Sequence, residues 1–303
     1  MSRPDPVTAP AHVIVINRWR EHYAEYAEYL DHASHHVTYI STEVGLGSVP
    51  ATATDVEIVD ATDDLDQVRT AAAALVGRHG IPDRIVALKE DDLLVGAQLR
   101  VDYGVVGDRP ENLLVFRDKL AMCRAIAEAG LPVPRFTVAA DLFDIRAMGE
   151  RVGWPLVLKP RIGSSSAGVT VLSGPAELDA LAPPTVPMLV QEFNPHPIHH
   201  VDGVFTPSGL LACKVSRYVN TCLGFREGTF LGSVEEDDPE VVAAVEAAAT
   251  DFLGALTRSS VPFHLEVFVS TGEAGVSCSF LEVAPGSAAR RSPCCGANCT
   301  AGT

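Results

Sequence analysis

The sequence predicts a mixed fold, α/β in the N-terminal part and α+β in the remainder. Over residues 1–110 short apolar strands alternate with helices, a pattern typical of a doubly wound parallel sheet. Beyond residue 193 strands follow one another across turns, which favours an antiparallel sheet. We therefore expect a parallel-sheet domain over 1–110, a small module over 111–192, an antiparallel module over 193–287 and an irregular tail over 288–303.

Composition limits what the chain can bind. Its 303 residues are 47% hydrophobic, enough to bury a sizeable core. The formal net charge of -16 argues against general affinity for nucleic acids or anionic membranes, because those surfaces reward clustered cations. No stretch has the pattern of a secretion signal or the length of a membrane span, so we expect a cytoplasmic protein.

The elements expected in the N-terminal domain alternate in type along the chain. The strands are His12–Ile16, Val37–Ile40, Val56–Val59 and Arg84–Leu88, and the helices are Arg20–Leu30, Asp63–Arg78 and Asp91–Tyr103. No Gly-x-Gly-x-x-Gly motif follows the first strand, so a dinucleotide site is not supported. Asp108-Arg109-Pro110 marks the linker that ends this domain.

The two later modules differ in their strand connections. The central module is expected to contain a helix that ends at Gly130, a strand near Phe136, helix Asp141–Arg151, a strand-loop-strand unit, helix Pro175–Leu181 and strand Met188–Gln191. The antiparallel module is expected to contain strands His199–Phe205, Leu210–Val219, Phe263–Val269 and Val276–Val283, with helix Asp238–Leu256 beside them.

The strand-loop-strand unit from Trp154 to Val169 carries a candidate phosphate site. Lys159 ends the first strand, and Ser164, Ser165 and Ser166 follow in a loop of small residues. Small residues let backbone N–H groups approach an anion closely, and the lysine adds a point charge. A flexible hairpin loop with a solvated lysine explains the same pattern.

Two glutamates near the C-terminus form a candidate metal site. If the last hairpin is symmetric about Ala274, Glu266 lies opposite Glu282 on one face of the sheet. Facing carboxylates repel each other unless they share a cation, and Mg²⁺ prefers such oxygen ligands. The neighbours Val267, Val269, Leu281 and Val283 are expected on the opposite, buried face, so a surface hairpin with two solvated glutamates is the alternative.

Taken in order, these motifs resemble the ATP-grasp superfamily, specifically its carboxylate–amine ligases of the biotin-carboxylase-like branch. The matching segments are Arg117-Asp118-Lys119, the Lys159 strand with its Gly/Ser loop, Gln191-Glu192-Phe193, His200-Val201-Asp202-Gly203, and the strands that bear Glu266 and Glu282. The resemblance implies that 1–110 is a pre-ATP-grasp domain, 111–192 a lid subdomain with a linker helix, and 193–287 the subdomain with the metal site.

The resemblance also implies a role for each matching residue. Lys119 and Lys159 match lysines that contact ATP phosphates. Glu266 and Glu282 match ligands of Mg²⁺, with Mn²⁺ as an alternative. The lid matches Ser164, Ser165, Ser166, Ala167 and Gly168, and the adenine connector matches Gln191, Glu192 and Phe193. The candidate catalytic residues are Lys159 and Arg217, although Arg217 is equally compatible with a charged strand surface. His264, beside the metal strand, either supports the metal site or is merely packed.

Two departures from the family pattern stand out. The place of the family's ribose-binding glutamate falls on Ile198, which shifts that contact to His196, His199 or another group. After Glu282 the expected arginine and Gly-rich turn are absent, and the tail over 288–303 contains Cys294, Cys295 and Cys299 without apolar periodicity. We therefore expect that a truncation or a reading-frame change has replaced the family's C-terminal segment.

The function implied by the resemblance is ATP- and Mg²⁺-dependent ligation. ATP would convert a small-molecule carboxylate into an acyl phosphate, which an amine attacks to form an amide or peptide-like bond. One alternative is a nucleotide-binding protein that has lost ligation through its altered C-terminus, and another is a biotin-carboxylase-like enzyme that acts on bicarbonate. A homodimer is compatible with the resemblance.

Overall fold

The computed structural model describes residues 10–20, 24–164, 166–220, 224 and 228–286. Its internal contacts divide the chain into two compact units, 1–114 and 115–303. The domain limits expected from the sequence stay predictions at the residue level. Within the described ranges no helix is long and apolar enough to cross a membrane.

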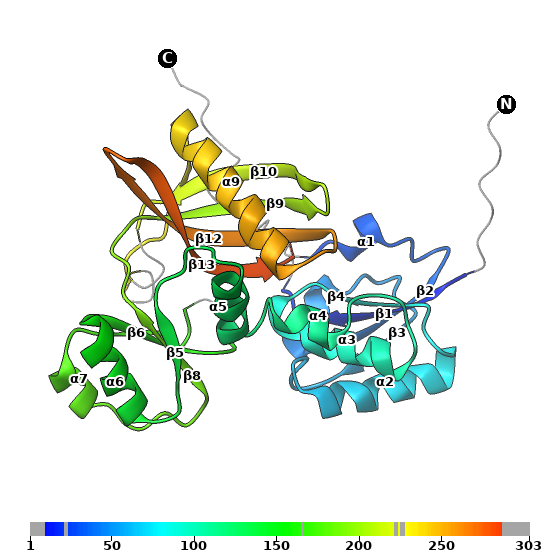
Figure 1. The fold of residues 1–303 in the computed structure, drawn as a ribbon. Coiled ribbons are helices and arrows are strands. Elements are labelled where there is room, and N and C mark those ends of the chain that lie inside the picture. Colours follow the sequence, from blue (N-terminus) through cyan, green and yellow to red (C-terminus); the bar gives the residue numbers. More distant parts are fainter. Residues whose placement is uncertain (1–9, 21–23, 165, 221–223, 225–227, 287–303) are drawn as a thin grey trace, which may run out of the picture. The chain divides into compact units, whose positions relative to one another are not determined.

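The first unit is built on the predicted parallel sheet (Figure 1), which is confirmed. Its strand order is β3-β2-β1-β4, with β1 (His12–Asn17), β2 (His36–Ser41), β3 (Asp55–Ile58) and β4 (Arg84–Ala87). Every residue of β1 is buried, as expected for a central strand covered on both faces. The helical segments are α1 (Tyr26–Tyr29), η1 (Glu43–Ser48), α2 (Leu65–His79), η2 (Glu90–Asp92), α3 (Leu93–Asp102) and α4 (Pro110–Leu114).

Helix α2 forms where the sequence pattern places it. The Asp64 side chain accepts hydrogen bonds from the backbone N–H groups of Asp66 and Gln67 and so caps the helix. Its apolar residues recur at helical spacing, and Val68 and Leu75 are buried in the core of the unit.

The predicted helix Arg20–Leu30 is wrong in extent, because the described part contains only the single turn α1. Tyr26 of that turn is buried, stacks edge-on against Tyr39 at 5.5 Å and donates a hydrogen bond to Asn17 Oδ1 at 3.0 Å. This tertiary anchoring, rather than helical periodicity, positions the segment.

The second unit contains two antiparallel sheets. The smaller has the order β5-β8-β6-β7, with β5 (Phe136–Ala139), β6 (Leu156–Pro160), β7 (Thr170–Leu172) and β8 (Met188–Glu192), and its helices are α6 (Leu142–Val152) and α7 (Pro175–Asp179). The larger has the order β11-β10-β9-β12-β13, with β9 (Ile198–Thr206), β10 (Gly209–Tyr218), β11 (Ser233–Glu235), β12 (Val261–Gly272) and β13 (Gly275–Pro285). The predicted antiparallel arrangement is therefore confirmed.

Two helices cover one face of the larger sheet. They are α5 (Lys119–Glu128) and α9 (Pro239–Leu256), and α9 runs across the strands in Figure 1. Phe252 of α9 packs edge-on against Phe280 of β13 at 5.4 Å, inside a core that also contains Val201 and Leu265. With this face closed by apolar contacts, the alternate residues of each strand lie on the opposite face.

A β-bulge sets the register of the last hairpin. Glu266 pairs with Glu282 as predicted, but the turn is centred between Glu273 and Ala274 rather than on Ala274. The register shifts by one residue between Glu266 and Val267, and this shift restores the glutamate pairing. The prediction that Leu281 faces the core is wrong, because the extra residue turns Leu281 toward a cavity and places Phe280 in the core.

Candidate functional site

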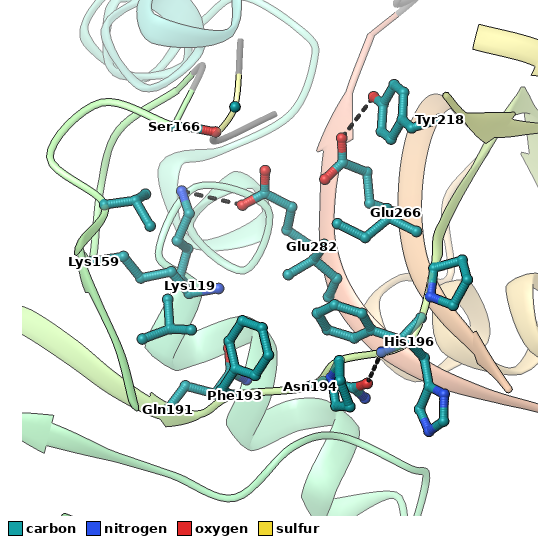
Figure 2. Close-up of a pocket in the computed structure, with 18 of the residues that line it drawn as sticks. Lys119, Lys159, Ser166, Gln191, Phe193, Asn194, His196, Tyr218, Glu266 and Glu282 are labelled. Atoms are coloured by element: carbon teal, nitrogen blue, oxygen red, sulfur yellow. Dashed lines mark hydrogen bonds and ion pairs between the residues drawn. The ribbon is translucent and has the colours of Figure 1, made fainter. Parts of the chain in front are cut away.

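A cavity of about 710 Å³ lies within the second unit and gathers most of the predicted site residues. Strand β6, its Gly/Ser loop and the segment after β8 form one wall, and strands β10, β12 and β13 form the other (Figure 2). The predicted residues that line it are Lys119, Lys159, Ser164, Ser166, Ala167, Gln191, Glu192, Phe193, Arg217, Glu266 and Glu282. This volume lies in the range of small-molecule sites.

The two remaining predicted loop residues are Ser165 and Gly168. Ser165 lies outside the described residues. Gly168 has a positive φ of 71°, and a Cβ at this position would come within 2.9 Å of Pro160 Cγ. Gly168 therefore serves the turn that returns the loop to the sheet, which only glycine makes without strain.

Lys119 is directed into the cavity by the start of helix α5. Asp118 caps this helix and forms an ion pair with Arg161, while the Lys119 backbone N–H donates to the Arg161 carbonyl at 2.8 Å. The Lys119 ammonium donates to the Gly163 carbonyl at 3.0 Å and lies 3.5 Å from a Glu282 carboxylate oxygen. Lys119 is thus held between the Gly/Ser loop and β13.

The triplet Arg117-Asp118-Lys119 is not an exposed charged face. Arg117 and Asp118 are only 2% and 4% exposed. Burial lowers the pKa of Arg117 to about 10, although the Glu282 carboxylate opposes this shift. Arg117 and Asp118 therefore do not belong to a solvated helix surface.

Lys159 is the second cation of the cavity and is buried at the end of β6. Burial lowers the pKa of its ammonium, and the nearby Glu282 carboxylate opposes that shift. A buried ammonium is costly unless anions lie nearby. In a chain with a net charge of -16, two lysines in one cavity wall form a local anion site.

The paired carboxylates on the opposite wall differ in their surroundings. Glu266 is buried and accepts a hydrogen bond from the Tyr218 hydroxyl at 2.8 Å, whereas Glu282 is about one-third exposed. Burial alone would raise the pKa of Glu266, but His264 and Tyr218 together lower it. Figure 2 shows the Glu282 carboxylate directed toward Lys119 and the Glu266 carboxylate directed toward Tyr218.

His264 contacts Glu266 and is therefore not merely packed. Its Nε2 atom lies 3.5 Å from the Glu266 carboxylate, and its Nδ1 atom lies 2.9 Å from Asp202 Oδ1. Burial would lower the pKa of His264, but its hydrogen bonds with Asp202 and Glu266 raise it to about 10. Sequence reasoning assigned no role to Tyr218, and it singled out Asp202 only as part of a family segment.

The segment after β8 contributes side chains and backbone to the cavity. Glu192 accepts two hydrogen bonds from the Arg135 guanidinium, at 2.8 and 2.9 Å, so its carboxylate is already paired with a residue that does not line the cavity. The backbone N–H groups of Glu192 and Phe193 donate to the carbonyls of Arg135 and Pro155. The next residue, Asn194, also lines the cavity.

The structure separates the two histidines considered for the ribose. His196 and Ile198 line the cavity. His199 is not in the lining: it is buried, and its Nε2 atom bonds the Glu236 carboxylate at 2.9 Å. Arg217 lies at the cavity edge, with half of its side chain exposed and Nε 3.8 Å from Glu236.

Residues 287–303, including Cys294, Cys295 and Cys299, lie outside the described residues. The expected truncation or frame change stays a prediction.

Comparisons with known proteins point to one group of enzymes. No protein-family profile matches the chain. The L-arginine-specific L-amino acid ligase of Bacillus subtilis is 27% identical over 226 residues, which cover 70% of this chain and 54% of that ligase. D-Alanine–D-alanine ligase of Bordetella pertussis is 32% identical over 107 residues, or 35% of this chain and 31% of that enzyme. The chain thus spans about half or less of these relatives.

Solved structures agree on the fold. An L-amino acid ligase from Bacillus licheniformis superimposes with a TM-score of 0.70 at 16% identity, covering 92% of this chain and 67% of that one. The ADP complex of an N5-carboxyaminoimidazole ribonucleotide synthetase superimposes with a TM-score of 0.68 at 18% identity, covering 92% and 71%.

Proposed function

Because the chain is an ATP-grasp protein related to carboxylate–amine ligases, we propose that it binds ATP with Mg²⁺ and activates a carboxylate for attack by an amine. The observation that carries the proposal is that Lys119 and Lys159 line the same cavity as Glu266 and Glu282, with Lys119 3.5 Å from Glu282. Phosphoryl transfer depends on positioned charge more than on covalent chemistry, and these groups supply charge of both signs.

Each wall of the cavity suits a different part of the nucleotide. Lys119 and Lys159 would contact the phosphates, and the hydroxyls of Ser164 and Ser166 would donate further hydrogen bonds. The apolar lining near Phe193 would accept the adenine, and His196, which also lines the cavity, would contact the ribose in place of the family's glutamate.

The carboxylate pair fits a divalent cation by its chemistry. Glu266 and Glu282 are cross-strand partners, and carboxylate oxygens are the ligands that Mg²⁺ and Mn²⁺ prefer. Bound Mg²⁺ would neutralise charge on the phosphate oxygens. Closure of the Gly/Ser loop would keep water from the acyl phosphate, which is readily hydrolysed.

The substrates are small-molecule carboxylates and amines by analogy with the relatives. Arg217 at the cavity edge is the proposed contact to the substrate carboxylate. The cytoplasmic location and the homodimer stay predictions.

Calorimetric titration with ATP and Mg²⁺ tests the nucleotide site. We expect saturable binding by the native chain and a loss of about 10- to 100-fold in affinity for Lys159→Ala, because a charge-assisted contact contributes about 1.5–3 kcal/mol. Lys214→Ala is the matched control, since Lys214 is an exposed lysine that pairs with Glu235 outside the cavity. Equal affinity in all three proteins would contradict the site.

ADP release then separates the alternatives. Release that requires both a carboxylate and an amine supports the ligase. Release with bicarbonate alone supports a carboxylase-like reaction, and ATP binding without release under any condition supports a nucleotide-binding protein that has lost ligation.

A further inference from the structure

We propose that His200, Asp202 and His264 form a second metal site, for a transition-metal ion of the Zn²⁺ class. It uses neither Glu266 nor Glu282 as a ligand, and it does not depend on ATP binding. His200 and Asp202 belong to β9 and His264 to β12, on the sheet face opposite α9.

The three side chains converge on one carboxylate. Asp202 and His264 are cross-strand partners, and His200 lies two residues from Asp202 on the same face. The Nδ1 atom of His200 lies 2.9 Å from one Asp202 oxygen, and that of His264 lies 2.9 Å from the other. One donor atom from each of the three residues falls within 4.8 Å of the others.

These separations suit a small ion. Zinc binds imidazole nitrogen and carboxylate oxygen at about 2.0–2.2 Å, so neighbouring ligand atoms in a tetrahedral site lie about 3.3–3.5 Å apart. Small side-chain rotations would bring the present arrangement to those distances. Two imidazoles favour Zn²⁺, Co²⁺ or Cu²⁺ over Mg²⁺, which prefers oxygen ligands alone.

The Nε2 atoms of His200 and His264 already have polar partners, as is usual for the ring nitrogen of a metal-binding histidine that does not bind the metal. His200 Nε2 lies 2.6 Å from the Ser233 hydroxyl. His264 Nε2 lies 3.5 Å from Glu266 and 3.4 Å from Tyr218, whose own hydroxyl hydrogen points to Glu266 at 2.8 Å. His264 Nε2 therefore has to carry a proton toward the carboxylate.

A metal ion and a proton compete for the position between the rings and the carboxylate. In its protonated form His264 donates from both ring nitrogens, to Asp202 and to Glu266. A metal ion would replace the proton on Nδ1 and bind both imidazoles and the Asp202 carboxylate together.

The site has room for a further ligand. The side chains of His200, Asp202 and His264 are 11%, 35% and 21% exposed. Three protein ligands leave a fourth position open to water or substrate, which is the arrangement of catalytic rather than structural zinc sites.

Metal titration of the full chain tests the proposal. Co²⁺ is added in excess Mg²⁺, which competes for the proposed site at Glu266 and Glu282, and visible absorption reports nitrogen ligation. Zn²⁺ affinity is then measured by competition. We expect one saturable equivalent, with binding at least about tenfold weaker in Asp202→Asn and His264→Gln. Glu282→Gln and His36→Gln, a change at an exposed histidine of the other unit, should bind as the native chain does.

Several results would overturn the proposal. Absence of saturable binding by the folded native chain would show that a proton, and not a metal ion, lies between His264 Nδ1 and Asp202. Binding lost in Glu282→Gln but kept in Asp202→Asn would place the metal at the carboxylate pair. Nitrogen NMR of the native chain needs no variant and is therefore independent of folding defects: Zn²⁺ must shift two histidine Nδ1 resonances, and no shift contradicts the site.

Discussion

Two buried carboxylates, Asp92 in the first unit and Glu266 in the second, lie in surroundings that shift their pKa values in opposite directions. Asp92 accepts a hydrogen bond from the Thr62 hydroxyl at 2.8 Å, and Arg18 lies 3.7 Å away. Its Oδ2 atom has no hydrogen-bond partner in the described part of the chain. Burial raises the pKa of Asp92 to about 6.

Glu266 is almost as buried, but His264 and Tyr218 face it with a positive charge and a donor, and its pKa is lowered. Burial alone drives a carboxylate toward its neutral form, and only surrounding donors keep it charged. A metal ligand has to be charged, as Glu266 is. In the first unit, by contrast, the ionised form of Asp92 lowers the free energy of unfolding.

Removing the Asp92 charge should have the largest effect. The folded-state pKa of about 6 lies above the ordinary value of 3.8, so the folded state binds this proton more tightly than the unfolded state. The free energy of unfolding should therefore fall as pH rises from about 4 to 7, by at most about 3 kcal/mol. Asp92→Asn should abolish that fall.

The free energy of unfolding is measured at pH 5 and 7 in the full chain, from the hydrogen exchange of the β1 amides corrected for intrinsic rates. An unchanged pH dependence in Asp92→Asn would show that Asp92 is not the titrating group.

The two paired glutamates should respond differently to neutralisation. Glu266→Gln and Glu282→Gln should each raise the Mg²⁺ concentration needed for half-maximal ATP binding by about tenfold or more. Only Glu266→Gln should also destabilise the protein, by about 1–2 kcal/mol, because it removes a buried charge from a hydrogen-bonded network.

Calorimetry and denaturant unfolding of both variants provide the measurements. Equal stability of the two variants would remove the distinction between the buried and the exposed carboxylate.

The Tyr218 hydroxyl should contribute a smaller amount to the charged state of Glu266. Tyr218→Phe removes the donor at 2.8 Å, so we expect Mg²⁺-dependent ATP affinity to fall about three- to tenfold, which corresponds to about 1 kcal/mol. Titration with ATP at fixed Mg²⁺ measures it. No change would mean that His264 alone keeps Glu266 charged.

The matching change in the first unit is Thr62→Val. It removes the Asp92 donor while keeping the side-chain shape, and it should raise the pKa of Asp92 further and cost about 1 kcal/mol at pH 7. Hydrogen exchange of β1 again provides the measurement, and stability equal to the native chain would contradict a role for this hydrogen bond.

Local patterns predicted much of the fold and the lining of the cavity. The β1 strand is fully buried, and helix α2 has its cap at Asp64, because apolar periodicity and capping act within a few residues. Lys159 and Glu282 line one cavity, as their family segments implied. The pairing of Glu266 with Glu282 was also predicted, although its symmetry argument omitted the bulge.

Contacts between distant segments decided the rest. The bulge that turns Leu281 into the cavity, the burial of Asp92 and the convergence of His200 with His264 depend on neighbours brought together only in the folded chain. The sequence by itself determined which elements form and which residue types are available for binding, because propensity and periodicity are local. The tertiary structure decided which carboxylates stay charged and which histidines meet, because burial and hydrogen-bond partners are properties of the packed molecule.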